Sequence, residues 1–241
     1  MAPKTGYRRG YAVAILIGLE NNAAFVWRVY SQVAKPEKTV LLEGIRSNPK
    51  AVYNFHEAIV DALRIIVKEG VRSIILVSPP RTTHSKEFAD HVKRHHTWLT
   101  QGGSRATFAE MIGSAATRED LTLLAKKPEL HKLIQDVNSQ ETENLLDLLE
   151  SWLNSPSENN VVLYSLEEAE ASIIYSRDNL TPEFIMLTNE YLANTRHKTR
   201  INKLLQIAAN KKIKTRVVDA KSPTGKRLSQ LGGIVCLARK E

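Results

Sequence analysis

Two adjacent glycines in a polar, basic stretch are the first residues in this sequence that suggest chemistry. They lie in residues 97–105, TWLTQGGSR, and we expect a short strand before them and a helix over residues 106–112 after them. Glycine adopts positive φ angles and lets the backbone approach a partner closely. The stretch therefore predicts a plain connection, an RNA contact or a catalytic loop. In the catalytic case the acting residues would be Gln101, Gly102, Gly103 and Ser104.

Two histidines four residues apart suggest a metal site as a second chemistry. His91 and His95 would share one face of a predicted helix, as paired zinc ligands do. A zinc hydrolase motif would place glutamate directly after the first histidine, whereas this chain has Val92. The intervening Lys93 and Arg94 favour a basic helix that faces RNA. We therefore predict no metal and no cofactor.

Further catalytic and anion-binding patterns are weak. Ser78 and Ser104 lack the flanking glycines of a nucleophile elbow, and the spacing of a phosphate-binding loop is absent. Residues 223–227, PTGKR, fit either an anion at a helix N-terminus or a capped helix start with solvated charges. The basic run from Arg196 to Arg216 fits an RNA-facing helix or a protein-binding face equally well.

Charge is distributed unevenly along the chain. Its 241 residues contain 34 Lys and Arg against 26 Asp and Glu, a net charge of +8. Residues 1–127 carry the whole excess, which favours a polyanion such as RNA as partner. The remainder is neutral in sum, but residues 128–190 are acidic and residues 191–241 are basic. This separation indicates two faces with different partners, or simply two solvated helix faces.

The cysteine content and hydropathy favour a cytoplasmic protein. The single cysteine, Cys236, lies in an apolar run, so we expect a buried thiol, no internal disulfide and a reducing compartment. No apolar run reaches the roughly 18 residues that a membrane-spanning helix requires. We expect no membrane association.

The first half of the chain predicts a mixed α/β sheet. Strands are expected over residues 11–18, 23–30 and 39–44, joined by turns at Asn21-Asn22 and Lys35-Pro36. Asn48-Pro49 opens a helix that ends at Gly70, and an apolar strand follows over residues 73–78. The remaining expected elements are a helix over residues 85–95, a strand over 97–99 and short helices marked by Phe108, Ile112, Leu121 and Leu124.

The second half predicts a three-layer α/β/α domain that starts after Lys127. Two acidic helices over residues 130–137 and 145–153 precede strands over 161–164, 184–188, 215–219 and 234–238. Helices alternate with these strands: one is capped by Ser165, one is marked by Ile201 to Ala208, and one follows Ser222-Pro223. The predicted domains are therefore residues 1–127 and 128–241.

Three strings in the second half resemble the family of pelota and the archaeal and eukaryotic class 1 release factors. Residues 225–239, GKRLSQLGGIVCLAR, resemble the last helix and strand of that family, and residues 163–169, LYSLEEA, resemble its Ala-Tyr-Gly-x-x-Glu-Val segment. Residues 185–192, IMLTNEYL, are similar to its Leu-Leu-x-Thr-Asp-x-x-Leu strand. The resemblance covers the central and C-terminal domains of the family. It implies an RNase H-like central domain and a C-terminal domain with the fold of kink-turn-binding ribosomal proteins.

This sequence departs from the family in two places. The family's N-terminal domain, which enters the decoding site, has no counterpart here. The loop that reads Gly-Gly-Gln in release factors, where it positions water for peptidyl-tRNA hydrolysis, reads Gly102-Gly103-Ser104. The absence of this glutamine and the short loop resemble pelota, which does not hydrolyse peptidyl-tRNA.

The resemblance implies a non-hydrolytic factor that binds ribosomes in rescue, splitting or recycling during mRNA surveillance, and we expect it to act as a monomer. Its central domain would contact ribosomal or transfer RNA through Arg8, Arg9, Lys93, Arg94, Gly102, Gly103 and Arg105. Its C-terminal domain would bind a translational GTPase of the elongation-factor-alpha type or the ABC-type recycling ATPase, through Arg196, Lys198, Arg200, Lys226 and Arg227. Two alternatives remain: a peptidyl-tRNA hydrolase that uses the Gly-Gly-Ser loop, and a ribosome hibernation factor.

Overall fold

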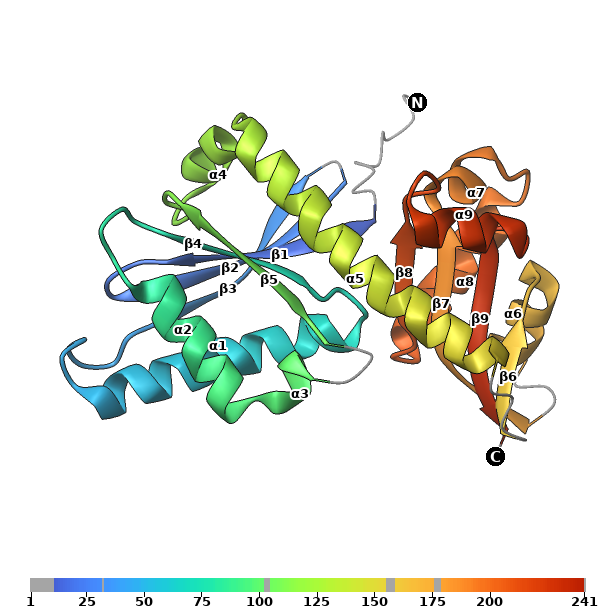
Figure 1. Ribbon diagram of the computed structural model, residues 1–241, viewed down its shortest axis with the longest axis horizontal. Coiled ribbons are helices and arrows are strands. Elements are labelled where there is room, and N and C mark those ends of the chain that lie inside the picture. The colour runs from blue at the N-terminus through green and yellow to red at the C-terminus, as the bar shows by residue number, and fades with distance from the viewer. Residues whose placement is uncertain (1–10, 32, 102–104, 155–158, 176–178, 241) are drawn as a thin grey trace, which may run out of the picture. The chain divides into compact units, whose positions relative to one another are not determined.

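A computed structural model of the chain describes residues 11–31, 33–101, 105–154, 159–175 and 179–240 (Figure 1). Its contacts divide the chain into two compact units. The first unit consists of the chain up to Leu63, Ser73–Thr97 and Thr107–Asn138, and the second consists of Arg64–Arg72, Trp98–Ala106 and the chain from Ser139 onward. Within the described ranges, no helix is long and apolar enough to cross a membrane.

The first unit is built on a five-stranded mixed sheet in the order β3-β2-β1-β4-β5. β1 (Ala12–Leu19), β2 (Ala23–Tyr30) and β3 (Ala34–Leu41) form the predicted antiparallel meander. β4 (Ser73–Ser78) lies parallel to β1, and β5 (Thr107–Ile112) lies parallel to β4. This is the RNase H-like arrangement expected for the central domain.

The edge strand β3 begins earlier than predicted. The sequence placed a turn at Lys35-Pro36, but Pro36 pairs with Trp27 of β2, and the register shifts between Val26 and Trp27. Proline cannot donate to a strand ladder and is therefore confined to edge strands and irregular positions. An edge strand beside a register shift meets both conditions, so the turn prediction at this position was wrong.

Helices cover both faces of the first sheet (Figure 1). α1 (Pro49–Lys68) and α2 (His84–His95) lie on one face, and α4 (Arg118–Ala125) and the first turns of α5 (Pro128–Asn154) lie on the other. Successive strand residues point to opposite faces of a sheet. The face toward α4 and α5 contributes one apolar cluster, which includes Leu16, Ile75, Val77, Leu121, Leu124 and Leu130.

The ends of α1 follow from its sequence, as predicted. The side-chain oxygen of Asn48 accepts a hydrogen bond from the backbone N–H of Lys50 at 3.0 Å, and Pro49 is the first helical residue. Proline suits this position because the first helical N–H has no partner within the helix. Gly70, with φ of 109°, follows the helix in the left-handed region that favours glycine.

The connection around the glycines differs from the prediction. Residues 97–100 form a short helix, α3 (Thr97–Thr100), instead of a strand, and residues 107–112 form strand β5 instead of a helix. Six consecutive pairings with β4, from Ser73–Thr107 to Ser78–Ile112, outweigh the helical preference of Ala109, Glu110 and Met111. The glycine stretch therefore leads from a helix into a strand, while Gly102, Gly103 and Ser104 themselves lie outside the described residues.

The second unit contains a four-stranded sheet in the order β6-β9-β7-β8. β7 (Leu180–Thr188) and β8 (Lys214–Val218) are parallel, whereas β9 (Ile234–Lys240) runs antiparallel to both β7 and β6 (Asn160–Leu163). All four strands were predicted from their apolar runs.

This sheet is covered on both faces, which confirms the α/β/α sandwich. Phe184 and Met186 of β7 pack in one cluster with α9 (Pro223–Gln230) and the later turns of α5. Ile185 and Leu187 pack in the other cluster with α6 (Leu166–Ile173) and α8 (Lys198–Asn210). A short helix, α7 (Asn189–Asn194), follows β7.

Helix α5 is continuous, although the sequence predicted two helices in its place. Residues 138–144, NSQETEN, are polar but include neither proline nor glycine, so nothing in them ends a helix. The turns up to Asn138 belong to the first unit, and those from Ser139 belong to the second. The domain ranges 1–127 and 128–241 stay predictions.

Candidate functional site

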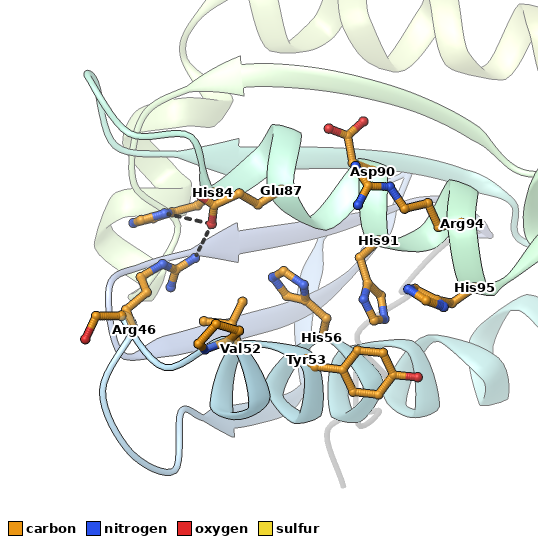
Figure 2. A pocket seen from close by; sticks show the side chains of 12 residues that line it. Arg46, Val52, Tyr53, His56, His84, Glu87, Asp90, His91, Arg94 and His95 are labelled. Carbon is orange, nitrogen blue, oxygen red and sulfur yellow. Dashed lines mark ion pairs between the residues drawn. The ribbon is translucent and has the colours of Figure 1, made fainter.

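A groove of about 500 Å³ lies between α1 and α2 in the first unit (Figure 2). Its lining residues on α2 recur at intervals of three and four, which places them on one face of the helix. The groove is lined by Arg46, Ser47, Pro49, Val52, Tyr53 and His56 from one side and by His84, Glu87, Asp90, His91, Arg94 and His95 from the other. Among the predicted RNA-binding residues that the structure describes, Arg94 lines this groove.

The packing of α2 against the sheet positions the groove. Phe88 and Val92 are fully buried on the inner face of α2, and His84 and His91 are also buried, at the border of that face. On the facing helix, Phe55 and Ile59 are buried and His56 is 3% exposed. His56, His84 and His91 therefore line the groove from the edge of the core, whereas His95 lines it from the exposed side of α2.

His91 is the centre of a cluster of aromatic and imidazole rings. Its ring centroid lies 5.0 Å from that of His56, 4.9 Å from that of His95 and 5.1 Å from that of Tyr53. The ring of His96 lies 5.5 Å away. These contacts fix the orientation of His91.

Glu57 joins two of these imidazoles. Its Oε1 lies 2.8 Å from Nε2 of His91 and 2.9 Å from Nε2 of His96, so one carboxylate oxygen meets two ring nitrogens. Burial alone would raise the pKa of Glu57, but the hydrogen bonds from His96 and His91 outweigh it and hold the pKa below its usual value. Burial also lowers the pKa of His91, against the attraction of Glu57.

His56 is neutral at physiological pH. Burial lowers its pKa to about 4, and the nearby His91 and Arg46 act in the same direction. Its Nε2 is buried and has no hydrogen-bond partner among the described residues. An imidazole in this state offers either one donor or one acceptor toward a ligand.

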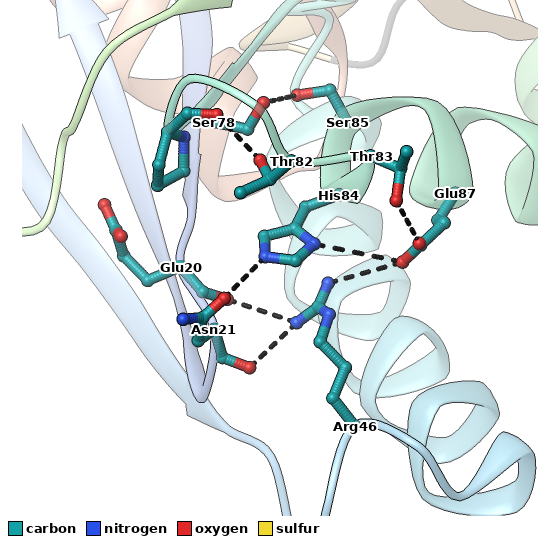
Figure 3. A network of polar contacts seen from close by, with 10 residues as sticks. Glu20, Asn21, Arg46, Ser78, Thr82, Thr83, His84, Ser85 and Glu87 are labelled. Atoms are coloured by element: carbon teal, nitrogen blue, oxygen red, sulfur yellow. Dashed lines mark hydrogen bonds and ion pairs between the residues drawn. The ribbon is translucent and has the colours of Figure 1, made fainter.

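A polar network closes the other end of the groove (Figure 3). Nε2 of His84 lies 2.9 Å from the side-chain oxygen of Asn21, and Arg46 donates Nη1–H to the backbone oxygens of Glu20 and Asn21 at 3.2 and 2.9 Å. Nη2 of Arg46 also lies 3.6 Å from Glu87. Burial is the largest influence on Arg46 and His84 and lowers the pKa of each. The network ties the β1–β2 turn to the starts of α1 and α2.

The charges in the groove balance closely. Two arginines, Arg46 and Arg94, oppose the carboxylates of Glu87 and Asp90, and the buried histidines favour their neutral forms. The exposed side chains of α2 include Lys93 and Arg94. The groove therefore offers neutral imidazoles to a ligand. The positive charge of α2 lies instead on its exposed face.

All three predicted RNA-binding residues that the structure describes have exposed side chains. Lys93 and Arg94 lie together at the end of α2, and Arg105 directly precedes Ala106 at the entry to β5. Gln101, from the catalytic alternative, is also exposed. The remaining predicted positions, Arg8, Arg9, Gly102, Gly103 and Ser104, lie outside the described residues.

The predicted partner-binding residues fall on opposite faces of the second sheet. Arg200 belongs to α8 and Lys198 begins it, whereas Lys226 and Arg227 belong to α9 on the other face. Arg196 precedes α8. Because β7 and β8 are parallel, the starts of both helices follow the same edge of the sheet. One partner would therefore have to reach around this edge to contact both groups.

Two of these cations already have partners within the unit. Nε of Arg200 donates to Glu170 at 3.2 Å, and Nε of Arg227 donates to Glu150 at 2.7 Å. The hydrogen bond to Glu170 is also the main reason that the pKa of Arg200 is raised. Arg196, Lys198 and Lys226 are exposed.

Glu57 and His56 were not predicted as site residues. Helical spacing could have found them, because Tyr53, His56 and Glu57 are three and four residues apart and so lie on neighbouring turns of α1. The sequence pairs His91 with His95 and gives His96 only as a nearby histidine, whereas in the structure His96, directly after α2, shares Glu57 with His91.

Comparison with known proteins shows the fold. No family model matches the sequence, and no curated protein matches it either. Dom34 from S. cerevisiae, a translation termination-like factor involved in RNA quality control that interacts with Hbs1, is 19% identical with a TM-score of 0.50, and the match covers 99% of this chain and 66% of Dom34. Archaeal Pelota, from a model of ribosome-bound Pelota and ABCE1, is 15% identical with a TM-score of 0.53, over 100% of this chain and 65% of Pelota.

The chain thus spans just under two thirds of the length of these structures. Both of its units are included in the match, because nearly every residue is covered. The chain has a Pelota-like fold, which confirms the fold implied by the sequence resemblance.

Proposed function

We propose that this protein is a pelota-like translation factor that binds ribosomes in rescue, splitting or recycling and does not hydrolyse peptidyl-tRNA. It would act in the cytoplasm as a monomer. The observation that carries the proposal is the match of the chain, over 99% and 100% of its length, to Dom34 and to archaeal Pelota. The first of these acts in RNA quality control, and the second is ribosome-bound.

The predicted domain of residues 1–127 would supply the RNA contact. Residues 1–127 carry the positive excess of the chain, and Lys93, Arg94 and Arg105 are exposed. Such contacts bind phosphates and release counterions, so their affinity falls steeply with salt. The same role is proposed for Arg8, Arg9, Gly102 and Gly103.

The second unit would supply the protein contact. Dom34 interacts with Hbs1, and archaeal Pelota occurs together with ABCE1. We assign the corresponding role here to a translational GTPase of the elongation-factor-alpha type or an ABC-type recycling ATPase. Arg196, Lys198 and Lys226 are exposed for such a contact, whereas Arg200 and Arg227 would exchange ion pairs that they already have.

Sedimentation with purified ribosomes tests the proposal. We expect the protein to sediment with ribosomes at low salt and to be released as salt rises. Charge reversal at Lys93 and Arg94 should lower the affinity for ribosomes. It should also make the remaining affinity less dependent on salt. Reversal at Lys50, an exposed lysine at the start of α1, is the matched control and should have a small effect. No sedimentation even at low salt would exclude the proposal.

Two further assays separate the alternatives. With labelled peptidyl-tRNA on stalled ribosomes, we expect no peptide release at saturating protein. Release that Gly103→Ala abolishes would establish the hydrolase instead. With the recycling ATPase and ATP present, we expect ribosomal subunits to separate, whereas stable occupancy of intact ribosomes would establish a hibernation factor.

A further inference from the structure

We propose that Glu57, His91 and His96 form a binding site for one divalent transition-metal ion of the zinc type. The three side chains each offer one ligand atom, and these atoms all lie within 4.8 Å of one another. The proposal is independent of the ribosome-binding function. A failure of either one leaves the other intact.

The three ligands come from positions that the fold holds in place. Glu57 is in the third turn of α1, and His91 is in the buried border of α2. His96 is the C-cap that follows α2, and its backbone N–H donates to the oxygen of Val92 at 2.9 Å. Because His96 leaves the helix, a spacing of five residues brings its ring beside that of His91, with 5.5 Å between the centroids.

Both imidazoles point their Nε2 atoms at the same carboxylate oxygen. The distances to Oε1 of Glu57 are 2.8 Å from His91 and 2.9 Å from His96. A carboxylate only accepts, so without a metal each ring donates its Nε2–H to it. With a metal, the ion takes the place of these two protons, and each ring carries its proton on Nδ1 instead.

The spacing requires a small adjustment. Zinc bonds to nitrogen and oxygen are about 2.0–2.2 Å, so ligand atoms in a tetrahedral site lie about 3.4 Å apart. Glu57 therefore has to withdraw by about half an ångström from each ring, and the two Nε2 atoms, which lie within 4.8 Å of one another, have to settle at the same spacing. Its side chain is 33% exposed and has room to move, whereas the side chains of His91 and His96 are 6% and 8% exposed.

The ligand set selects the metal. Two imidazoles and one carboxylate suit zinc and its neighbours in the first transition row, while magnesium and calcium prefer oxygen ligands. Three protein ligands leave a fourth position for water or another ligand. The ring of Tyr53 lies 5.1 Å from that of His91 and supports its orientation from the groove side.

Titration calorimetry tests the site. It measures the binding of zinc to the metal-stripped, untagged chain. We expect one ion per chain and no binding of magnesium. His91→Ala and His96→Ala should each weaken binding by at least about tenfold. His95→Ala is the matched control, because His95 is exposed, lies beside the two histidine ligands and is outside the set. Equal weakening by His95→Ala, or no saturable binding, would overturn the proposal.

A second measurement separates metal loss from misfolding. Tetrahedral cobalt absorbs visible light strongly, so cobalt should give this spectrum with the native chain and not with His96→Gln. Zinc should raise the melting temperature of the native chain and of Glu110→Gln, an exposed carboxylate on β5, but not that of Glu57→Gln. The assignment would be disproved by variants that, in the absence of metal, melt at the same temperature as the native chain and that still bind zinc as tightly as the native chain does.

Discussion

The indole nitrogen of Trp27 donates a hydrogen bond to the backbone oxygen of Ala115 at 2.7 Å, joining residues 88 positions apart. The same oxygen lies close to Gly18, where an added Cβ would approach it to 2.9 Å. Trp27 is 4% exposed and Ala115 is fully buried. This buried hydrogen bond thus links Trp27 of β2 to the segment after β5 inside the core of the first unit.

Replacing Trp27 by phenylalanine should destabilise the protein by about 1–3 kcal/mol, because the buried oxygen of Ala115 loses its donor. Denaturant unfolding followed by circular dichroism measures the change. Trp98→Phe is the control, since Trp98 is 38% exposed and should give a smaller loss. Equal losses in the two variants would refute the role of this hydrogen bond.

Gly225→Ala should destabilise α9, although alanine normally favours a helix over glycine. A Cβ at this position would lie 1.9 Å from the backbone oxygen of Asp219 and 2.7 Å from the Cα of Ala220. Backbone atoms cannot give way cheaply, so we expect a loss of more than about 1 kcal/mol. Thermal unfolding measures it, with the neighbouring exposed Lys226→Ala as a control. A raised melting temperature for the glycine variant would contradict the packing described.

Acid should weaken the capping box at the start of α4. The backbone N–H of Thr117 donates to Asp120 at 3.0 Å, and this is the main reason that the pKa of Asp120 lies below its usual value. A depressed carboxyl pKa adds stability above its unfolded value near 3.8, and this stability disappears as pH falls through the lower folded value.

Melting temperatures between neutral pH and pH of about 2 check this expectation. Asp120→Asn should lie below the native protein at neutral pH and approach it in acid. Glu119→Gln, exposed on the same helix, should keep the native profile. A constant difference between Asp120→Asn and the native protein at all pH values would argue against the titration.

Two ion pairs of the second unit should differ greatly in how much they contribute to the free energy of unfolding. Glu141 and Arg216 are 2% and 3% exposed and lie 2.9 Å apart, whereas Glu183 and Arg239 lie 2.8 Å apart but are 39% and 58% exposed. Removing one member of a buried pair leaves a buried charge and costs about 3–5 kcal/mol. An exposed pair is worth about 0–1 kcal/mol. Denaturant unfolding of Glu141→Ala and Glu183→Ala compares them, and equal losses would contradict this ranking.

Elements with strong local signals were predicted correctly from the sequence. β1, β2 and β4 are apolar runs bounded by turn residues, and α1 has both a proline start and a glycine end. The cap of α6 was equally clear, since Ser165 and Glu168 form the predicted capping box. In these segments local preference and tertiary packing favour the same conformation.

β5 was not predictable because its conformation depends on a distant strand. The segment TFAEMI mixes residues that favour helix and strand, and its pairing with β4 decides the outcome. The cluster of Glu57, His91 and His96 was missed for a similar reason. Its hydrogen bonds join residues 34 and 39 positions apart, and only the packing of α1 against α2 brings them together.

The edge strand β3 has a consequence for association between chains. An unpaired strand edge offers donors and acceptors to which another chain can add a strand. On β3, Pro36 removes one donor, and Lys35 and Lys38 place positive charge beside it. A second copy that approached this edge would meet the same charge and the same missing donor, so β3 disfavours strand addition at its own edge of the sheet.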